Sequence, residues 1–572
     1  MRIFTSIIGI TICLIFLPVL LKADNFYVKN YGAAGDGIKD DGPTIQKAFN
    51  AMKSHSGKHT LVFESGRQYY IRDIEGIYLF KLIDQSNLTI DGNGAVFLLD
   101  GAKRLISAQN SGNLVLKNLS IDYKQLPFVE GKIIAINQTD GYVDVQIDGY
   151  FEMPPPGGPT NLSHEQAYFG QVWYDGPNSL LSSHYYVKDM HEIYPGSSRD
   201  RKLRVDATNF REWNKIAVNQ TISLPVRGNA HIGGNEVVHL VECRNIVLEN
   251  VNIWSAPWFA VGLTRNLGEV KFSHVNVTPK PGTKRILSSW RDGIHVKSNY
   301  ARLVFDSCHL EGMGDDAFNI ATFMSSVKKV ISGNQIQIKQ NFPLSIVPYN
   351  TGDVVVVYDI VQGIILGKSS ITSSSGFVQT GATPAPLLTL RLKDAIRDMN
   401  LHCVVWNESS ANPNTLLKNC SIYKSCRFQS SVTIDNCNII AFSWFWTTNI
   451  EGPIPGDVVV RNSRLFVGRG NDKMAASFNT SLSDGGKVYP SVGQPISNVL
   501  LQNNEIRGNL MIKYCKKVSV VDNNFSGKNS EIQIGNCGKL LFSDNMLNGS
   551  KLERRDQIIF MDEESKRGTT VK

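Results

Sequence analysis

Two short segments of the sequence carry residue types that can do acid–base chemistry. Segments 292–296 and 316–320 share the pattern Asp-x-apolar-x-apolar and start 24 residues apart, and Asp315 directly precedes Asp316. Asp292, Asp315 and Asp316 therefore belong to one pair of segments. Like charges held close together raise the pKa of at least one of them, which leaves a protonated acid beside ionised bases. Hydrolysis of a glycosidic bond needs this division of labour, whereas the alternative is an Asp stack that coordinates Ca²⁺ or caps turns.

Aromatic and polar residues at related positions are candidates for binding a sugar. Aromatic rings beside acids form a stacking surface for the apolar faces of sugars, and a guanidinium group can donate hydrogen bonds to hydroxyls. The alternative for each ring is a place in the hydrophobic core, and His295 and His309 alternate with apolar residues, so either face is open to them. The candidate substrate-binding residues are Trp258, His295, Arg427, Trp444, Trp446 and Glu451, the last in a predicted loop.

The elements that must position these residues belong to an internal repeat. A nine-residue unit is mostly apolar at its second and fourth places, has Asn, Asp, Ser or His at the sixth and is apolar at the ninth. Alternating apolar residues predict a strand, and Asn or Asp at a fixed place can adopt left-handed backbone at a turn. The repeat distance and the short strands favour a right-handed parallel β-helix over a leucine-rich repeat. The copies start at Asn113, Asn245, Glu269, Arg302, Asn414, Ser431, Asp457, Asn498, Lys517 and Lys539.

Stacking of these coils is expected to bring the acids together. The 24-residue spacing corresponds to one coil, so we expect Asp292 and Asp316 on adjacent rungs, about 4.8 Å apart at the backbone. We expect Asp315 to be the general acid, while Asp292 and Asp316 hold and deprotonate a water, with inversion at the anomeric carbon. Inversion needs carboxyl groups about 6.5–9.5 Å apart, against about 5–5.5 Å for retention. Side chains that diverge from neighbouring rungs are expected to reach the longer distance.

The remaining segments divide the chain around this solenoid. Residues 30–48 resemble the opening motif of the pectate-lyase-like β-helix superfamily, and they predict a helix from Pro43 that covers the open end of the solenoid, with Asp40 and Asp41 in capping roles. Two stretches break the period with alternating patterns. The fold class is thus all-β, a right-handed parallel β-helix with an N-terminal capping helix and two inserted antiparallel β modules. The predicted divisions are a signal peptide (1–23), the cap and first coils (24–123), an inserted module (124–238), the catalytic coils (239–322), a second module (323–404), the C-terminal coils (405–550) and a fraying polar tail (551–572).

The first 23 residues predict export. A basic start, an apolar run to Leu21 and a small residue at Ala23 are typical of a secretory signal peptide cleaved after Ala23; a retained membrane anchor is the alternative. Removal of Arg2 and Lys22 changes the formal net charge from +8 to +6. The mature protein is expected to be periplasmic or extracellular, without stable membrane association. Because 59 basic residues face 51 acidic ones and no Lys/Arg cluster occurs, nucleic acid is not an expected partner.

Composition and cysteine spacing exclude further classes. With 42% hydrophobic and 19% charged residues, the chain is not disordered, collagen-like or a coiled coil. Eight cysteines remain after cleavage, and none lies in a CxxC or Cys/His metal spacing. No metal or other cofactor is expected. The similar contexts of four cysteines predict one place in the repeat and free, buried thiols: Cys308, Cys420, Cys437 and Cys537.

The acid-bearing segments and their surroundings resemble glycoside hydrolase family 110. The likeness is sharpest in residues 291–295 and 308–319, and weaker around Arg427 and in residues 451–453. The resemblance implies an exported β-helix α-galactosidase that acts on α-1,3-linked terminal galactose of glycans. The sequence departs from the family where it reads Asn-Ile-Ala at 319–321 instead of Asn-Val-His, and Arg-Phe at 427–428 instead of Arg-Gly. We therefore expect this chain to share the fold and the acids of the family more closely than the exact sugar on which the family acts.

Two functions from other classes remain open. A polysaccharide lyase would use Ca²⁺ and an Arg or Lys base on a uronate-containing polysaccharide, and a non-catalytic β-helix would only bind glycans. The products separate them, because a lyase makes an ultraviolet-absorbing unsaturated sugar and a hydrolase releases a reducing sugar.

Overall fold

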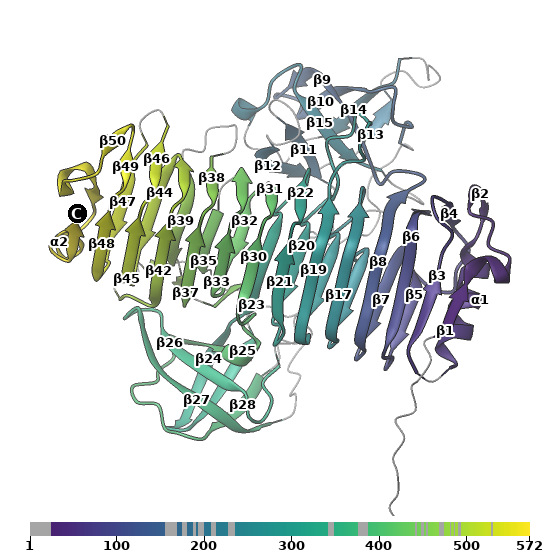
Figure 1. Cartoon of the computed structure of the whole chain (residues 1–572). Coiled ribbons are helices and arrows are strands. Elements are labelled where there is room, and N and C mark those ends of the chain that lie inside the picture. The colour runs from purple at the N-terminus through teal and green to yellow at the C-terminus, as the bar shows by residue number, and fades with distance from the viewer. Residues whose placement is uncertain are drawn as a thin grey trace, which may run out of the picture.

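A computed structural model describes residues 24–572. Its description leaves out residues 56, 155–168, 174–179, 187–189, 193–199, 207–212, 227–234, 341–347, 376–386, 441–442, 448–450, 454–455, 468–473, 481, 485–486, 490–492 and 528–529. The described chain is a rod of stacked parallel strands with one β module on either side in this view (Figure 1). The predicted all-β parallel β-helix is confirmed.

Each coil of the rod adds strands to two parallel sheets. The first sheet, which we call the site sheet, has one short strand per coil and continues from the N-terminal end to the C-terminal end. Its path contains β5 (Tyr78–Ile83), β7 (Arg104–Gln109), β16 (Val238–Val241), β18 (Val261–Thr264), β20 (Ile294–Lys297), β23 (Phe318–Phe323), β32 (Cys426–Phe428), β35 (Ser443–Thr447), β39 (Met474–Thr480), β44 (Asn509–Lys513), β47 (Ile532–Gly535) and β51 (Ile559–Phe560). Off this path, β36 (Glu451–Gly452) pairs antiparallel with β23.

The second sheet is bent, because the chain turns inside each repeat unit. Its strands are β1 (Asp24–Tyr27), β2 (Asp36–Asp40), β3 (His59–Val62), β4 (Gln68–Ile71), β6 (Leu88–Leu99), β8 (Gly112–Tyr123), β17 (Arg244–Ile253), β19 (Leu267–Val277), β21 (Arg302–Asp306), β22 (His309–Glu311), β30 (Thr415–Lys418), β31 (Ser421–Tyr423), β33 (Val432–Asp435), β34 (Asn438–Ile440), β37 (Asp457–Arg461), β38 (Arg464–Phe466), β42 (Ile496–Gln502), β43 (Glu505–Arg507), β45 (Cys515–Val521), β46 (Asn524–Ser526), β48 (Lys539–Ser543), β49 (Met546–Leu547), β50 (Ser550–Lys551) and β52 (Thr569–Val571).

The turn falls at the sixth residue of every predicted unit. All ten sixth residues have φ between 52° and 56°, the left-handed region that Asn and Asp tolerate better than most other residues with a side chain. Strands from neighbouring units pair parallel and in register, for example Asn498 with Lys517. The first coils escaped the sequence pattern. In one of them β6 turns at Asn93, where its register with β8 shifts, so the nine-residue spacing is lost.

The interior of the rod is apolar and carries ladders of buried amides. Apolar residues of successive coils pack into one continuous core. Buried Asn266 donates to the carbonyl oxygen of Leu240 and to the side chain of Asn299, which lies one coil further along. Because every amide in such a ladder has a partner, the turns can be buried without orphaned polar groups.

Both ends of the rod are covered. Helix α1 (Gly42–Lys53) packs its apolar side on the first coils, and the carboxylate of Asp41 accepts hydrogen bonds from the backbone N–H groups of Ala34 and Gly35 rather than capping the helix by its side chain. Residues 551–572, expected to fray, instead form a last coil with β51, α2 (Glu563–Arg567) and β52. Leu552 is fully buried, so a few apolar residues suffice to anchor a polar end segment.

All eight cysteines among the described residues are free and buried, which confirms the predicted thiols. Cys308, Cys420 and Cys437 occupy the seventh place of their units, and Cys420 contacts both of the others. The fourth assignment was wrong: Cys537 precedes its unit and contacts Cys515 instead. Similar neighbours in sequence therefore did not mean the same place in the coil.

Two antiparallel modules are inserted between coils. The first, a seven-stranded sheet, lies above the rod in Figure 1, and the second, a closed barrel, lies below it. The barrel's last strand ends at Asn407, three residues beyond the expected boundary. The sheet consists of β9 (Phe128–Asn137), β10 (Tyr142–Ile147), β11 (Phe169–Trp173), β12 (Leu180–Tyr186), β13 (Met190–Glu192), β14 (Lys202–Asp206) and β15 (Thr221–Pro225), and the barrel of β24 (Ser325–Ser332), β25 (Gln335–Gln340), β26 (Val354–Asp359), β27 (Ile364–Ser374), β28 (Leu387–Leu392) and β29 (Cys403–Asn407). A short hairpin pairs β40 (Leu482–Asp484) with β41 (Lys487–Tyr489).

The expected signal peptide, residues 1–23, lies outside the described residues. Among the residues that are described, no helix has the length and apolar character needed to cross a membrane.

Candidate active site

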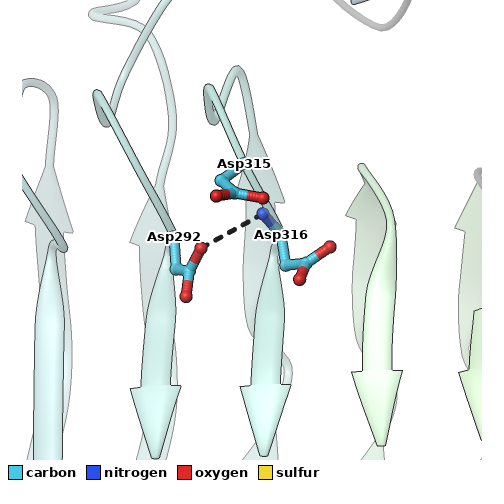
Figure 2. Close-up of side chains that lie close together, drawn as sticks. All are labelled: Asp292, Asp315 and Asp316. Carbon is cyan, nitrogen blue, oxygen red and sulfur yellow. Dashed lines mark hydrogen bonds between the residues drawn. The ribbon is translucent and has the colours of Figure 1, made fainter. Parts of the chain in front are cut away.

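The three candidate acids lie at the start of two neighbouring strands of the site sheet. Asp292 precedes β20 and Asp316 precedes β23, and these strands pair in register with Ile294 opposite Phe318. The two acids therefore occupy equivalent places on adjacent rungs, as the 24-residue spacing predicts. The backbone N–H of Asp316 donates to Oδ1 of Asp292 over 3.3 Å (Figure 2).

The carboxylates converge closely. One oxygen from each of Asp292, Asp315 and Asp316 lies within 4.8 Å of the others. Figure 2 shows the Asp315 carboxylate lying on the side of Asp292, while that of Asp316 points away towards the next rung. Asp292 and Asp316 are only 2% and 7% exposed, whereas Asp315 is partly exposed. The spacing is shorter than the distance expected for an inverting pair of carboxyl groups.

Burial governs the protonation of the two inner acids. Burial, strengthened by the charges of Asp315 and Asp316, raises the pKa of Asp292 well above its ordinary value. Burial also raises the pKa of Asp316 to about 6, although the nearby Arg427 opposes the shift. Both shifts favour retention of a proton within this pair of acids, and Arg427 favours the charged form at Asp316 rather than at Asp292.

Three cations near the acids each pair with a carboxylate. Arg291 Nη2 lies 3.0 Å from Asp315 Oδ2. Arg427 bridges Asp316 and Glu451, at 3.1 Å and 2.8 Å. The buried Lys297 lies 3.0 Å from Glu451 and donates to Asn319 Oδ1 over 2.6 Å. Burial alone raises the pKa of Glu451, but Lys297 and Arg427 outweigh it and lower this pKa to about 2.

His295 lies beside Asp292 as a neutral ring. Its Nε2 is 3.9 Å from Asp292 Oδ2, and its ring stacks on Phe259 with centroids 4.1 Å apart. Burial, followed by the charge of Lys297, lowers the pKa of His295 well below its usual value. A neutral imidazole can donate or accept a hydrogen bond here without adding charge. His309 lies on β22 of the other sheet, where it contacts Glu311.

The candidate tryptophans have different outcomes. Trp258 is half-buried, and the guanidinium of Arg291 lies 5.3 Å from its ring centroid, so it belongs to the surroundings of the acids. The backbone of Trp444 pairs with that of Arg427, and the strand continues to Trp446. The side chains of Trp444 and Trp446 lie outside the described residues.

Four further residues reach the site that sequence reasoning did not single out. Arg291, Lys297 and Asn319 form the contacts given above, and Ser425 Oγ donates to Asp316 Oδ1 over 2.8 Å. Lys297 could have been predicted from the alternation along β20, because His295 and Lys297 are two residues apart and fall on the same outward face of the strand. For Ser425, which lies 109 residues from Asp316, a signal exists only once the coils are stacked.

A metal is the structural alternative at this point. Asp292, Asp315 and Asp316 are the one group of three or more potential ligands, among the described residues, that is close enough to hold an ion. Ca²⁺ takes six to eight oxygen ligands, so three carboxylates would need several more donors. The raised pKa of Asp292 and the guanidinium on Asp316 suit a proton-sharing site better than a cation site.

Comparison with known proteins points to one group of enzymes. No family model matches the chain. It is 27% identical over 342 residues to "Alpha-1,3-galactosidase B" of Bacteroides thetaiotaomicron, covering 54% of this chain and 53% of that protein. It is 34% identical over 359 residues to "Alpha-1,3-galactosidase B" of Phocaeicola vulgatus, covering 57% and 56%. The chain thus spans about half the length of the curated relatives it matches.

Among solved structures, the "Mannuronan C-5 epimerase AlgE4 A-module" of Azotobacter vinelandii matches with a TM-score of 0.41 at 12% identity, covering 96% of this chain and 100% of that one. This likeness is too low to bear on function. The sequence similarity confirms the resemblance seen in the acid-bearing segments: the chain is a relative of proteins named alpha-1,3-galactosidase.

Proposed function

We propose that the chain is an exported, exo-acting glycoside hydrolase that releases terminal α-linked galactose from glycans. The observation that carries the proposal is the cluster of Asp292, Asp315 and Asp316 on adjacent rungs, with one oxygen of each within 4.8 Å. The similarity to proteins named alpha-1,3-galactosidase supports the choice of sugar and linkage.

The three acids divide the chemistry as follows. Asp315 is the most exposed and acts as the general acid on the departing glycosidic oxygen. Asp292, whose pKa burial raises well above its ordinary value, supplies the proton to Asp315 through one bridging water as substrate binds. The ionised Asp292 and Asp316 then hold a water, and Asp316 takes its proton while the oxygen attacks the anomeric carbon. The glycosidic bond breaks, the new bond to the water oxygen forms, and the proton taken up by Asp316 passes through solvent to Asp292, which restores the starting state.

We propose inversion as the stereochemical outcome. The divergence of the Asp316 side chain from Asp292 and Asp315 favours a water site apart from the acid (Figure 2). The separation of at most 4.8 Å between one oxygen of each acid, taken alone, is closer to the separation in retaining enzymes, about 5–5.5 Å. Time-resolved NMR of the first-formed galactose tests this point, since a retained α-anomer overturns the inverting water site.

The charges of the site favour a neutral sugar. Arg291, Lys297 and Arg427 each pair with a carboxylate at 3.1 Å or less. A lyase acting on uronate needs a cation to hold the substrate carboxylate and a base beside it. Since these three cations are already engaged, the site supports hydrolysis of an uncharged glycoside better than β-elimination.

A panel of α-galactosides and galactose-terminated glycans tests the proposal. We expect release of free galactose, no ultraviolet-absorbing product and no loss of activity on chelation. Activity should rise with pH through about 6, because Asp316 must ionise to act as a base. Loss of activity on chelation that Ca²⁺ restores, together with an unsaturated product, would show a lyase, and binding without any product would show a glycan-binding solenoid.

The assignment of Asp315 has its own test. Asp315→Asn should be rescued by an aryl galactoside with a good leaving group, because such a substrate needs little protonation. Asp316→Asn should not be rescued by the same substrate. Rescue of Asp292→Asn alone would exchange the roles of Asp292 and Asp315.

A further inference from the structure

The inserted seven-stranded sheet touches the segment that leads into Asp292. Residues 278–293 connect β19 to β20, and within them Leu287 and Trp290 are fully buried in the hydrophobic core of the inserted sheet rather than in that of the rod. The backbone two residues before Asp292 is therefore held by a different part of the protein from the coil to which Asp292 belongs.

One side chain of the sheet reaches both acid-bearing segments. Gln171, on β11, is fully buried, and its Nε2 donates to the carbonyl oxygen of Trp290 over 2.9 Å. The same amide fills the space beside Gly314, where an added Cβ would come 2.3 Å from Nε2. Trp290 lies two residues before Asp292, and Gly314 directly precedes Asp315. The amide of Gln171 is thus packed between the two backbones that set the separation of these acids.

A second side chain holds the same connection further back. Glu130, on β9, is 3% exposed, and its carboxylate accepts hydrogen bonds from the backbone N–H groups of Ile286 and Leu287, the shortest at 2.8 Å. A buried carboxylate bonded to backbone N–H groups fixes a loop more firmly than a neutral acceptor does. Gln171 and Glu130 therefore grip the connection at two points.

We propose that Gln171 and Glu130 are positioning residues for the acids, and that the inserted sheet sets the distance between Asp292 and Asp315. The role presupposes the proposed hydrolase function. A displacement of about 1 Å at a reacting group can cost on the order of a hundredfold in rate, so an amide between the two backbones controls catalysis without touching substrate.

The principal test is Gln171→Met, which keeps the length of the side chain and removes its hydrogen bond to Trp290. We expect kcat to fall about 10- to 100-fold, with KM within about twofold because no substrate contact is lost. Hydrogen exchange should become faster in residues 286–293 and 313–316. Gln146→Met is the matched control, since Gln146 Nε2 donates to the carbonyl oxygen of Asp200 in the same sheet over 2.7 Å. The control should leave kcat and both segments unchanged.

Glu130 gives an independent pair of variants. Glu130→Gln keeps an acceptor for the two N–H groups and should retain most of the activity, whereas Glu130→Leu removes both acceptors and should lower kcat as Gln171→Met does. Unchanged kcat and unchanged exchange in Gln171→Met would overturn the positioning role. If the wild-type protein releases no sugar, the proposed function fails, and the exchange comparison between the two Met variants still decides whether Gln171 orders the acid-bearing segments.

Discussion

The two inserted modules contact opposite ends of the same strand of the site sheet. The seven-stranded sheet holds the connection before β20, where Asp292 lies, through Gln171 and Glu130. The barrel contacts the turn after β20, where Tyr300 donates to Asp353 over 2.7 Å. The two insertions thus have different consequences. The seven-stranded sheet, which contacts the chain before β20, positions the acids, whereas the barrel, which contacts the chain after β20, is only attached to the rod there.

The comparison depends first on the acids being the reacting groups. Asp292→Asn, Asp315→Asn and Asp316→Asn should each lower kcat by about 10²–10⁴-fold, because each removes a group that holds or transfers a proton. Steady-state kinetics on an α-galactoside measures the loss, and circular dichroism checks that the fold survives. Near-normal kcat in all three variants would show that these acids are not the reacting groups, and the comparison of the two modules would then have no bearing on catalysis.

The pH dependence of protein stability tests the contact that Glu130 of the seven-stranded sheet makes. Burial, only partly opposed by N–H bonds and Arg285, raises the pKa of Glu130 from 4.5 to about 7, and Asp148 adds to the rise. The folded state therefore binds this proton more tightly than the unfolded state, and the resulting stability is lost as pH rises from 4.5 through about 7. The loss amounts to about 3 kcal/mol.

Glu130→Gln cannot ionise, so its stability relative to the wild type should improve by about 3 kcal/mol between pH 4.5 and pH 8. Urea unfolding at both pH values measures this difference. Because the acids at the site titrate in both proteins, they cancel in the comparison. A constant difference across this range would mean that Glu130 is not buried as the structure has it.

Substitution of Arg427 tests the contribution of residues that lie on the site sheet itself and belong to neither inserted module. Arg427→Ala removes the bridge between Asp316 and Glu451. The fall in kcat/KM should correspond to a loss of about 1–3 kcal/mol of transition-state stabilisation. Trp446→Ala should show a loss of the same order if its ring binds sugar. A large fall in melting temperature with unchanged kinetics would instead assign these residues to the core.

The smallest expected effect concerns the barrel. Tyr300→Phe removes the hydrogen bond to Asp353, which keeps the amide of Asn407 as a partner at 2.7 Å, and it removes the hydroxyl that accepts from Asn350 Nδ2 over 3.0 Å. Stability should fall by about 1 kcal/mol, while kcat stays as in the wild type. A drop in kcat like that expected for Gln171→Met would abolish the distinction between the two modules.

Much of the fold could be predicted because each coil contacts only its neighbours. The nine-residue unit encodes a strand, a left-handed turn and a second strand, and in-register stacking then follows from a local pattern. The same logic brings Asp292 and Asp316 to adjacent rungs from their 24-residue spacing alone. Where a bulge changes the spacing, as at Asn93, the pattern and the prediction fail together.

The tertiary structure alone decided the surroundings of the acids. Gln171 reaches Trp290 across 119 residues, and Glu130 reaches Leu287 across 157. The raised pKa of Asp292 depends on burial that no spacing reveals. Glu451 joins Lys297 and Arg427 only because β36 folds back against β23. Periodicity records which residues share a rung, whereas desolvation and contacts between inserted modules arise only when distant segments pack together.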